Sequence, residues 1–195
     1  MPTTPLRQIF AQFRSDAKTE REKGNYFEEL IRTYLRHEPV YAELYSDVWL
    51  LNEVPPKLGI SKQDAGIDLV ARTRSTNQLH AIQCKFYDEE HRIQKADIDS
   101  FFTASGQKPF THRVIVSSTN HWGEKAEAAL FNQQPPVSVI DLHDLENSQI
   151  EWAKYKGKKK PALKPKYKSK PHQKSAISAV MSGLKKSDRG KLIMA

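Results

Sequence analysis

The sequence of 195 residues predicts an α/β sandwich in which helices flank a central mixed β-sheet. Residues 67–73 and 79–86 are apolar and β-branched, and turn-forming residues near Thr76 and Asn77 separate them, so they indicate an antiparallel β-hairpin. Helical patterns then alternate with strand patterns, at residues 94–105, 112–118, 121–133 and 137–140. Such β-α-β units add parallel strands, which makes the predicted sheet mixed.

Two amphipathic helices are expected before the sheet. Residues 4–18 carry an apolar stripe, with Thr4 as a suitable N-cap and Pro5 in the first turn. The stripe is typical of a helix that packs on its own domain, and docking to a partner is the less common use. Gly24 precedes the second helix, which is expected at about residues 25–37.

The remaining elements of this domain are short. A first strand is expected at residues 45–52, before a Val-Pro-Pro sequence, because proline ends strands. A loop over residues 55–65 then leads into the hairpin. A final helical segment is expected within residues 141–155, after the last strand.

Basic residues are concentrated near the C-terminus. Residues 150–195 hold 14 Lys and Arg against 2 Asp and Glu, a net charge of +12, whereas residues 1–149 hold 17 against 21, a net charge of −4. The Lys/Pro-rich residues 156–170 indicate a linker, which acts either as a solvated tether or as an arm that contacts phosphates. An amphipathic helix over 171–186 and a buried strand over 190–195 are expected after it.

Cysteine and histidine usage narrows the chemistry. The single cysteine, Cys84, excludes an internal disulfide and a zinc site built on cysteines, and suits a small core position. The seven histidines form no ligand-spaced cluster with it, so zinc-dependent nuclease chemistry is not indicated. The chain has no apolar segment after Met1 and no long apolar run, so a cytoplasmic location is expected.

The hairpin carries the strongest chemical signal. A two-residue loop would set Asp68 opposite Lys85, with Gln83 two residues along on the same face. The apolar side chains would face a core on the other side: Ile67, Leu69, Ala71, Ile82, Cys84 and Phe86. A carboxylate, a second oxygen ligand and a lysine suit Mg²⁺-assisted hydrolysis of a phosphodiester. A surface hairpin with scattered charge is the alternative.

Two further acids are candidates for this site. Glu28 lies at the border of the apolar stripe of the second helix, from which it could reach into a site, whereas Glu29 lies on the solvent face. Asp64 precedes the hairpin in a loop, where it is either a turn residue or a residue that lines the site. Asp64 ranks below Asp68, because a loop fixes geometry less well than a strand.

Several stretches together resemble the PD-(D/E)xK nuclease superfamily, in its Mrr-like restriction endonuclease branch. They occur in the family's order: GNYFEELI (24–31), QDAGIDLVA (63–71), AIQCKFY (81–87) and RVIVSSTNHWGEKAEAAL (113–130). No one of these motifs is specific alone, but the ordered set spans roughly residues 20–155. The set looks most like the N-terminal nuclease domain of type I single-polypeptide restriction-modification enzymes, which implies a restriction-endonuclease-like fold and DNA cleavage.

The resemblance also implies a ligand set. Mg²⁺ would be held by Asp68, Gln83 and the backbone carbonyl of Cys84, with Lys85 acting on the phosphate or the attacking water. Glu28 would approach from its helix, and Asp64 would be a second-tier residue. The wider superfamily has Glu or Asp at the position of Gln83, and the Mrr-like branch tolerates Gln.

The C-terminal residues resemble the start of a superfamily 2 helicase motor. Pro171-His172-Gln173 looks like its Q motif, in which the glutamine contacts adenine, and GKLIMA looks like the strand before the phosphate-binding loop. The resemblance therefore implies a nuclease domain over 1–155, a linker over 156–170 and a truncated motor domain over 171–195. ATP would act only in a full-length enzyme, and Gln173 would have no nucleotide to bind here.

The expected partners are double-stranded DNA and the motor, methyltransferase and target-recognition domains of the same polypeptide. One rival interpretation is a non-catalytic module that docks DNA or the motor, and the neutral Gln83 is the feature that favours it. A Holliday-junction resolvase would share the fold, but it fits poorly with a chain that runs into a motor.

Overall fold

The computed structural model describes residues 3–62, 66–157, 159–165 and 170–187, and the chain divides into two compact units, residues 1–163 and 164–195. The elements of the first unit are α1 (Pro5–Asp16), α2 (Glu20–His37), α3 (Pro39–Leu44), β1 (Tyr45–Leu50), β2 (Leu69–Thr73), β3 (Leu79–Lys85), α4 (Lys95–Ser105), β4 (Phe110–Ser117), α5 (Glu124–Leu130), β5 (Val137–Ile140) and α6 (Leu142–Glu146). Short 3-10 helices occupy Leu51–Glu53, Pro56–Leu58 and Trp152–Lys154.

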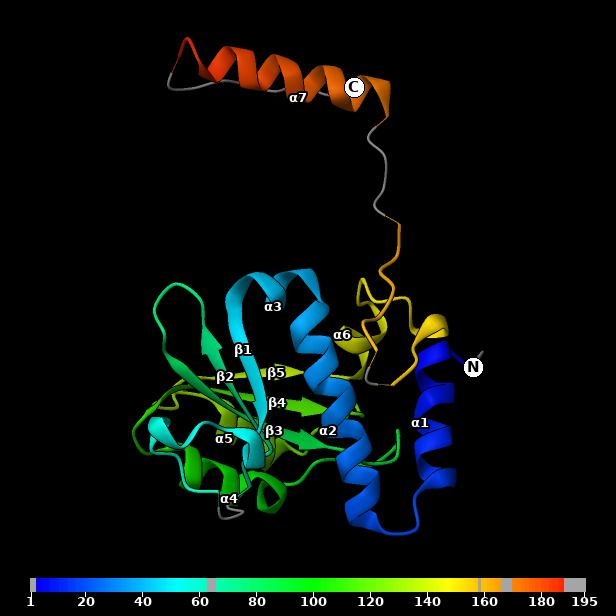
Figure 1. The fold of residues 1–195 in the computed structure, drawn as a ribbon, viewed down its shortest axis with the longest axis vertical. Helices are drawn as coiled ribbons and strands as arrows, with labels where there is room; N and C mark the ends of the chain where they lie inside the picture. The colour runs from blue at the N-terminus through cyan, green and yellow to red at the C-terminus, as the bar shows by residue number, and fades with distance from the viewer. Residues whose placement is uncertain (1–2, 63–65, 158, 166–169, 188–195) are drawn as a thin grey trace. The chain divides into compact units, whose positions relative to one another are not determined.

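The strands form one sheet in the order β1-β2-β3-β4-β5 (Figure 1). β2 pairs antiparallel with β1 and with β3, whereas β4 pairs parallel with β3 and with β5. Helix α4 connects β3 to β4, and α5 connects β4 to β5, as β-α-β crossovers require. The prediction of an α/β sandwich with a mixed sheet is confirmed.

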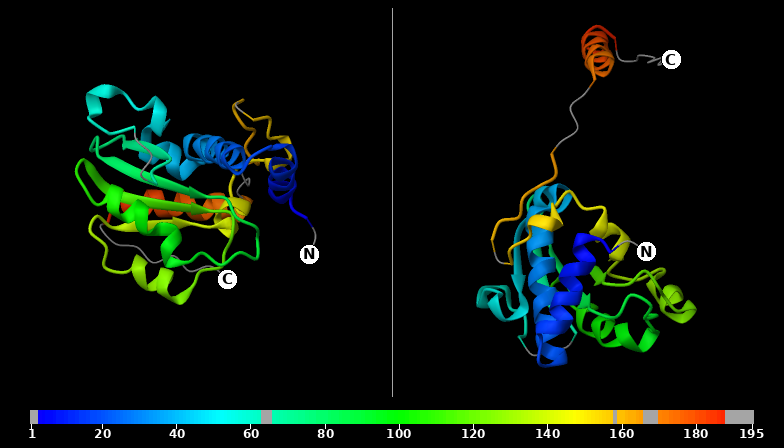
Figure 2. Two further views of the ribbon diagram at one scale, coloured as in Figure 1. Left: turned by 90° about the horizontal axis from the view of Figure 1, so that it is seen from below. Right: turned by 90° about the vertical axis from the view of Figure 1, so that its right-hand side faces the viewer.

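Helices cover both faces of the sheet, and each face has its own hydrophobic core (Figures 1 and 2). On one face, residues of α1, α2 and α6 pack against Leu69 and Ile82. On the other face, residues of α4 and α5 pack against Val70 and Ala81. Because both faces are buried, polar side chains of the central strands reach an open space only at the strand ends.

The loop of the β2–β3 hairpin is longer than predicted. The backbone N–H of Thr73 donates to the carbonyl of Gln78 at 2.9 Å, which closes a loop of four residues, 74–77. Asn77 has a φ of 55°, a left-handed conformation that asparagine tolerates better than most residues. The expected two-residue loop at Thr76 and Asn77 is therefore wrong.

The longer loop changes the register by two residues. Leu69 lies opposite Ile82, so the same register places Asp68 opposite Gln83 and not, as predicted, opposite Lys85. The faces of the strands are unaffected, because side chains alternate with a period of two and a shift of two preserves their side.

One apolar residue of the hairpin belongs to the other core. Ile67 packs in the core beneath α4 and α5, whereas Leu69 and Ala71 pack beneath α1 and α2. The sequence predicted one common face for the three. The regular strand begins only at Leu69, so the alternation of the strand does not extend back to Ile67.

The two N-terminal helices begin with N-caps, one predicted and one not. Thr4 accepts a backbone hydrogen bond at the start of α1, as expected. Helix α2 begins at Glu20 rather than near residue 25, because the hydroxyl of Thr19 accepts the backbone N–H of Glu22 at 3.1 Å. Gly24 therefore lies inside the helix instead of before it.

Other boundaries differ modestly from the predictions. Helix α5 begins at Glu124, three residues later than expected, and α3 was not predicted. The expected helical segment over 141–155 divides into α6 and the 3-10 helix at residues 152–154.

The first unit extends into the predicted linker. The N–H of Glu151 donates to the carbonyl of Ala162 at 2.8 Å, and Ile150 forms an isolated antiparallel bridge with Leu163. Pro161 is buried. The chain around residues 161–163 is thus anchored on the first unit.

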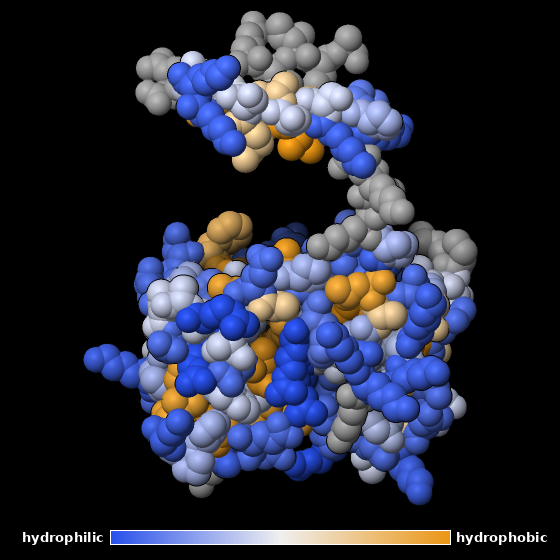
Figure 3. Space-filling model, turned by 45° about the horizontal axis from the view of Figure 1, so that its top comes forward, coloured by the Kyte–Doolittle hydropathy of each residue, from blue (hydrophilic) through white to orange (hydrophobic). Residues whose placement is uncertain are grey.

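The second unit contains helix α7 (Pro171–Leu184), close to the predicted helix over 171–186. Ile177, Met181 and Leu184 are more than half exposed and recur at helical spacing, and Figure 3 shows apolar side chains along this helix. The expected strand over 190–195 lies outside the described residues. Among the helices that the structure describes, none combines the length and apolarity needed to cross a membrane.

Candidate active site

Asp68 is fixed between two strands at one end of the sheet. Its backbone N–H donates to the carbonyl of Ile82 at 2.9 Å, and its carbonyl accepts the N–H of Leu51 at 2.9 Å. Its carboxylate oxygen Oδ2 accepts the backbone N–H of Cys84 at 2.6 Å. The carboxylate therefore lies against the backbone of the Gln-x-Lys sequence of β3.

A cavity of about 500 Å³ opens beside Asp68. Helix α2 contributes Glu28 to its wall, so the structure brings the predicted helix acid and the predicted strand acid to one space. The other described residues of the wall are Arg21, Gly24, Asn25, Glu29, Leu50, Leu51, Asn52, Lys62 and Ile67. This lining is rich in charged and amide groups, which suits an ion and a phosphate better than an apolar ligand.

Gln83 is buried at the end of the hairpin, under the chain that leads into β2. It is 2% exposed, and its amide nitrogen Nε2 lies 3.1 Å from where a Cβ on Gly66 would stand. Gly66 has a φ of +87°, and the same Cβ would come within 2.9 Å of the Ser100 hydroxyl. Only glycine can occupy position 66 without a strained backbone and a steric clash.

The amide oxygen of Gln83 has no hydrogen-bond partner within the described part of the chain. A buried acceptor in that state costs about 1–3 kcal/mol, so such atoms point to a missing partner. Gln83 is not among the described residues that line the cavity beside Asp68. Its oxygen is therefore enclosed within the sheet rather than exposed on the cavity wall.

Lys85 is the last residue of β3, and its carbonyl accepts the N–H of Ser118 at 3.0 Å. Burial raises the pKa of the neighbouring Cys84 thiol well above its usual range, and the charges of Asp68 and Glu28 raise it further, while Lys85 lowers it. The thiol is therefore protonated and inert.

Glu29, which follows Glu28 on α2, belongs to a group of ion pairs. Glu29 forms an ion pair with Arg32, which also donates to Glu53 at 2.7 Å. Glu29 also lines the cavity, so it is not purely a solvent-facing residue as predicted.

Three polar residues of the cavity wall were not predicted as part of a site: Arg21, Asn25 and Lys62. Arg21 was missed because α2 was expected to begin after it. The Thr19-Glu20-Arg21-Glu22 sequence could have revealed the earlier start, since a threonine followed three residues later by a glutamate is a helix N-terminal signal.

The sequence also singled out Asp64 and Gln173. Asp64 lies outside the described residues. Gln173 belongs to the second unit, where its side-chain oxygen accepts the N–H of Lys170 at 2.9 Å and caps α7.

A separate group of possible metal ligands consists of Asp141, His143 and Asp144, which are grouped at the start of α6. The side chains of Asp141 and Asp144 cap that helix reciprocally, at 3.0 and 3.1 Å. Helix capping accounts for their proximity.

The mixed sheet and its helical layers define a restriction-endonuclease-like α/β fold. A family model described as restriction endonuclease, of the Mrr type, matches residues 36–162. The chain therefore belongs to the restriction endonuclease family, a family of DNA endonucleases.

Solved structures with the same fold include an ATP-dependent Type ISP restriction-modification enzyme, LlaBIII, bound to DNA. The similarity to LlaBIII has a TM-score of 0.79 and 34% identity, and covers 95% of this chain but only 12% of that one. The restriction endonucleases MspJI and AspBHI give TM-scores of 0.48 and 0.49 at 16% and 18% identity, too low to support an argument. The matched region makes up 29% of the MspJI chain and 35% of the AspBHI chain. No curated protein sequence matches significantly.

Proposed function

We propose that this chain is a Mg²⁺-dependent endonuclease domain that hydrolyses DNA phosphodiester bonds. The observation that carries the proposal is the placement of the Asp68 carboxylate on the Cys84 backbone, beside a polar cavity that Glu28 also lines. Family membership supports the same reaction class.

The donor atoms at the end of the hairpin fit Mg²⁺. Asp68 offers a carboxylate, and Gln83 a buried amide oxygen that has no partner among the described residues. We assign the ion to Asp68, Gln83 and the carbonyl of Cys84, because Mg²⁺ takes oxygen ligands and few carboxylates. When bound, the ion polarises a phosphoryl oxygen and lowers the pKa of a bound water.

The chain's own residues would supply positioning and charge. Lys85 neutralises the negative charge that develops on the phosphoryl oxygens, or orients the attacking water. Glu28 faces the same cavity from α2 and holds the water or a further cation. Asp64 remains a second-tier candidate. Burial of the donors on the sheet keeps the geometry fixed before DNA arrives.

We further propose that the domain works within a larger restriction-modification enzyme that contains an ATP-driven DNA translocase. The support is the similarity to LlaBIII, an ATP-dependent Type ISP restriction-modification enzyme whose structure was solved bound to DNA. In such an enzyme, residues 171–195 would begin the motor and Gln173 would contact adenine. Double-stranded DNA and the motor, methyltransferase and target-recognition domains would be the partners, in the cytoplasm.

The proposal is tested with supercoiled plasmid DNA and Mg²⁺. We expect slow nicking without sequence preference by the parent chain, and a loss of at least about 100-fold in Asp68→Asn and in Lys85→Ala. Lys85→Ala should still bind metal, because the lysine acts on phosphate or water. Nicking by Lys85→Ala at the parent rate would contradict the assignment of catalytic residues.

A non-catalytic module that docks DNA or the motor is the alternative. The neutral Gln83 favours it, because an amide binds Mg²⁺ more weakly than a carboxylate. Under this alternative the parent chain would bind DNA without nicking it at any Mg²⁺ or Mn²⁺ concentration.

A further inference from the structure

Lys85 is the last residue of β3, where it pairs with Ser117 of β4, and the chain leaves the sheet directly after it. The next residues, 86–91, run from β3 toward α4 outside the named strands. On one side, this segment is held by Ser118, the residue directly after β4, whose hydroxyl accepts the N–H of Tyr87 at 2.8 Å and donates to its carbonyl at 2.6 Å.

On its other side the segment is held by α1. Arg14 donates to the carbonyl of Tyr87 at 2.7 Å, pairs with the carboxylate of Asp88 at 3.0 Å, and lies 4.7 Å from the centre of the Phe86 ring. A single arginine of α1 thus contacts three consecutive residues that follow Lys85.

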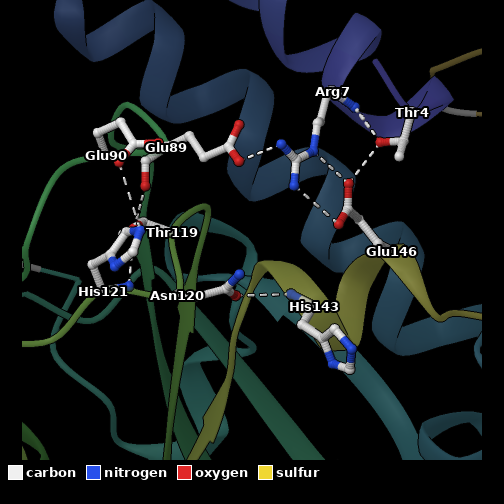
Figure 4. A network of polar contacts seen from close by, with 9 residues as sticks. All are labelled: Thr4, Arg7, Glu89, Glu90, Thr119, Asn120, His121, His143 and Glu146. Carbon is white, nitrogen blue, oxygen red and sulfur yellow. Dashed lines mark hydrogen bonds and ion pairs between the residues drawn. The ribbon is translucent and has the colours of Figure 1, made fainter. Parts of the chain in front are cut away.

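A second arginine of α1 extends the contact (Figure 4). Arg7 pairs with Glu89 and, through its Nε, with Glu146 of α6 at 2.7 Å. Thr4 donates to the same Glu146 carboxylate at 2.7 Å. These pairs raise the pKa of Arg7, chiefly through its hydrogen bond to Glu146, so the guanidinium stays charged.

The aromatic ring of Phe86 completes the attachment. It packs edge-on to Phe10 of α1, with ring centres 5.3 Å apart, and stacks on Phe27 of α2 at 5.0 Å. Because Phe86 directly follows Lys85, this packing determines how the chain leaves β3.

We infer that Arg14 and Arg7 of α1 are positioning residues that clamp residues 86–89 and thereby fix Lys85 in its working geometry. The inference rests on the proposed function of Lys85. It also gives a role to α1, which lies outside the matched residues 36–162. The physical reason is that displacement of a catalytic group by about 1 Å can cost on the order of 100-fold in rate.

The test uses the full chain with Arg14→Gln and Arg14→Lys. Arg72→Gln is a matched control: Arg72 also pairs with an aspartate, Asp47, at 3.0 Å and lies over an aromatic ring, that of Trp49, at 5.5 Å. The exposed fractions of the two arginine side chains are 32% and 30%. Arg72, however, joins β1 to β2 and does not contact residues 86–91.

We expect Arg14→Gln to lower the single-turnover nicking rate by about tenfold at unchanged DNA affinity. Arg14→Lys should recover part of the loss, because it retains the charge but not the fork of donors. Amide hydrogen exchange of residues 87–91 should rise in Arg14→Gln only. Arg72→Gln should leave both the rate and this exchange at the parent values.

Two results would overturn the inference: a parent rate in Arg14→Gln despite faster exchange, or an equal loss of rate in Arg72→Gln. If the parent chain itself fails to nick DNA, the proposed function is wrong. Hydrogen exchange still tests the clamp in that case, because unchanged exchange of residues 87–91 in Arg14→Gln would show that Arg14 does not hold this segment.

Discussion

At the scale of single residues, Gln83 is the most informative position. The sequence predicts it beside Asp68 and Lys85, and the structure adds that its amide is buried with an oxygen that lacks a partner among the described residues. The burial could not be predicted, because it depends on Gly66 passing directly over the amide. The sequence pattern contains both Gly66 and Gln83, but it does not reveal that the backbone of one passes over the side chain of the other.

Replacing Gln83 by glutamate should separate metal binding from stability. The new carboxylate would be buried near Asp68, so the metal-free protein should melt at a lower temperature. Mg²⁺ should bind roughly tenfold more tightly, a gain of about 1.4 kcal/mol, and raise the melting temperature more than in the parent. Thermal melts over a Mg²⁺ titration measure both effects.

Gln78→Glu, at an exposed position next to the hairpin loop, is the control and should match the parent. Equal Mg²⁺-dependent increments in the melting temperatures of Gln83→Glu and the parent would remove Gln83 from the ligand set.

At the scale of elements, the sequence predicted the strands along the chain, the antiparallel hairpin and the mixed sheet, but not the hairpin register. The register depends on loop length, and nothing in residues 74–77 distinguishes a two-residue from a four-residue loop by composition alone. The predicted face of each strand side chain is still correct, because the register differs by two residues and side chains alternate with a period of two. Helix α2 was misplaced for a different reason, since Gly24 resembles a helix boundary but lies inside the helix.

The far end of the sheet contains a pair of histidines that should make stability depend on pH. Burial, with a contribution from His112, lowers the pKa of His80 to about 4, and the Tyr45 hydroxyl lies 3.0 Å from its Nδ1. The unfolded chain, with a histidine pKa near 6.5, therefore binds more protons than the folded chain between these values. Stability should fall as the pH is lowered through this window.

Urea unfolding at pH 7.5 and pH 5 measures the effect. Between these two pH values, the free energy of unfolding should fall by on the order of 1 kcal/mol more in the parent than in His80→Gln. A fully buried imidazole would give a larger difference, but that of His80 is partly exposed. His143→Gln, at an exposed position, should lose as much as the parent. A parent and a His80→Gln variant with the same pH dependence would exclude His80 as the cause.

At the scale of the whole molecule, the charge is divided between an acidic core sequence and a basic C-terminal quarter. The structure places the boundary later than the sequence predicted, because residues around 161–163 pair with residues 150–151 on the first unit. Composition predicts a tether here, and it could not reveal that Pro161 is buried.

We expect the lysines before this anchor to carry much of the sequence-independent affinity for DNA. Lys156, Lys159 and Lys160 are exposed, and none forms an ion pair with the described acidic residues. Replacing all three by glutamine should reduce the slope of log affinity against log salt by about 2.7, or about 0.9 for each lost phosphate contact.

The control removes the same charge from α7 and the residues after it, with glutamine at positions 174, 185 and 186. It should change the slope less, because the backbone of the anchored loop is already ordered on the unit that contains the cavity. If the two triple variants show the same slope of log DNA affinity against log salt, the affinity depends on total charge and not on where the lysines lie.

The attachment of α1 has a consequence for how the protein is made. Arg14 and Tyr87 are separated by 73 positions, and Arg7 and Glu146 by 139. At a synthesis rate of roughly 5–20 residues per second, α1 leaves the ribosome on the order of 10 seconds before Glu146 exists. The contacts of Arg14 with residues 86–88 can therefore form as soon as those residues are made, whereas the pair of Arg7 with Glu146 forms only when most of the domain has been synthesised.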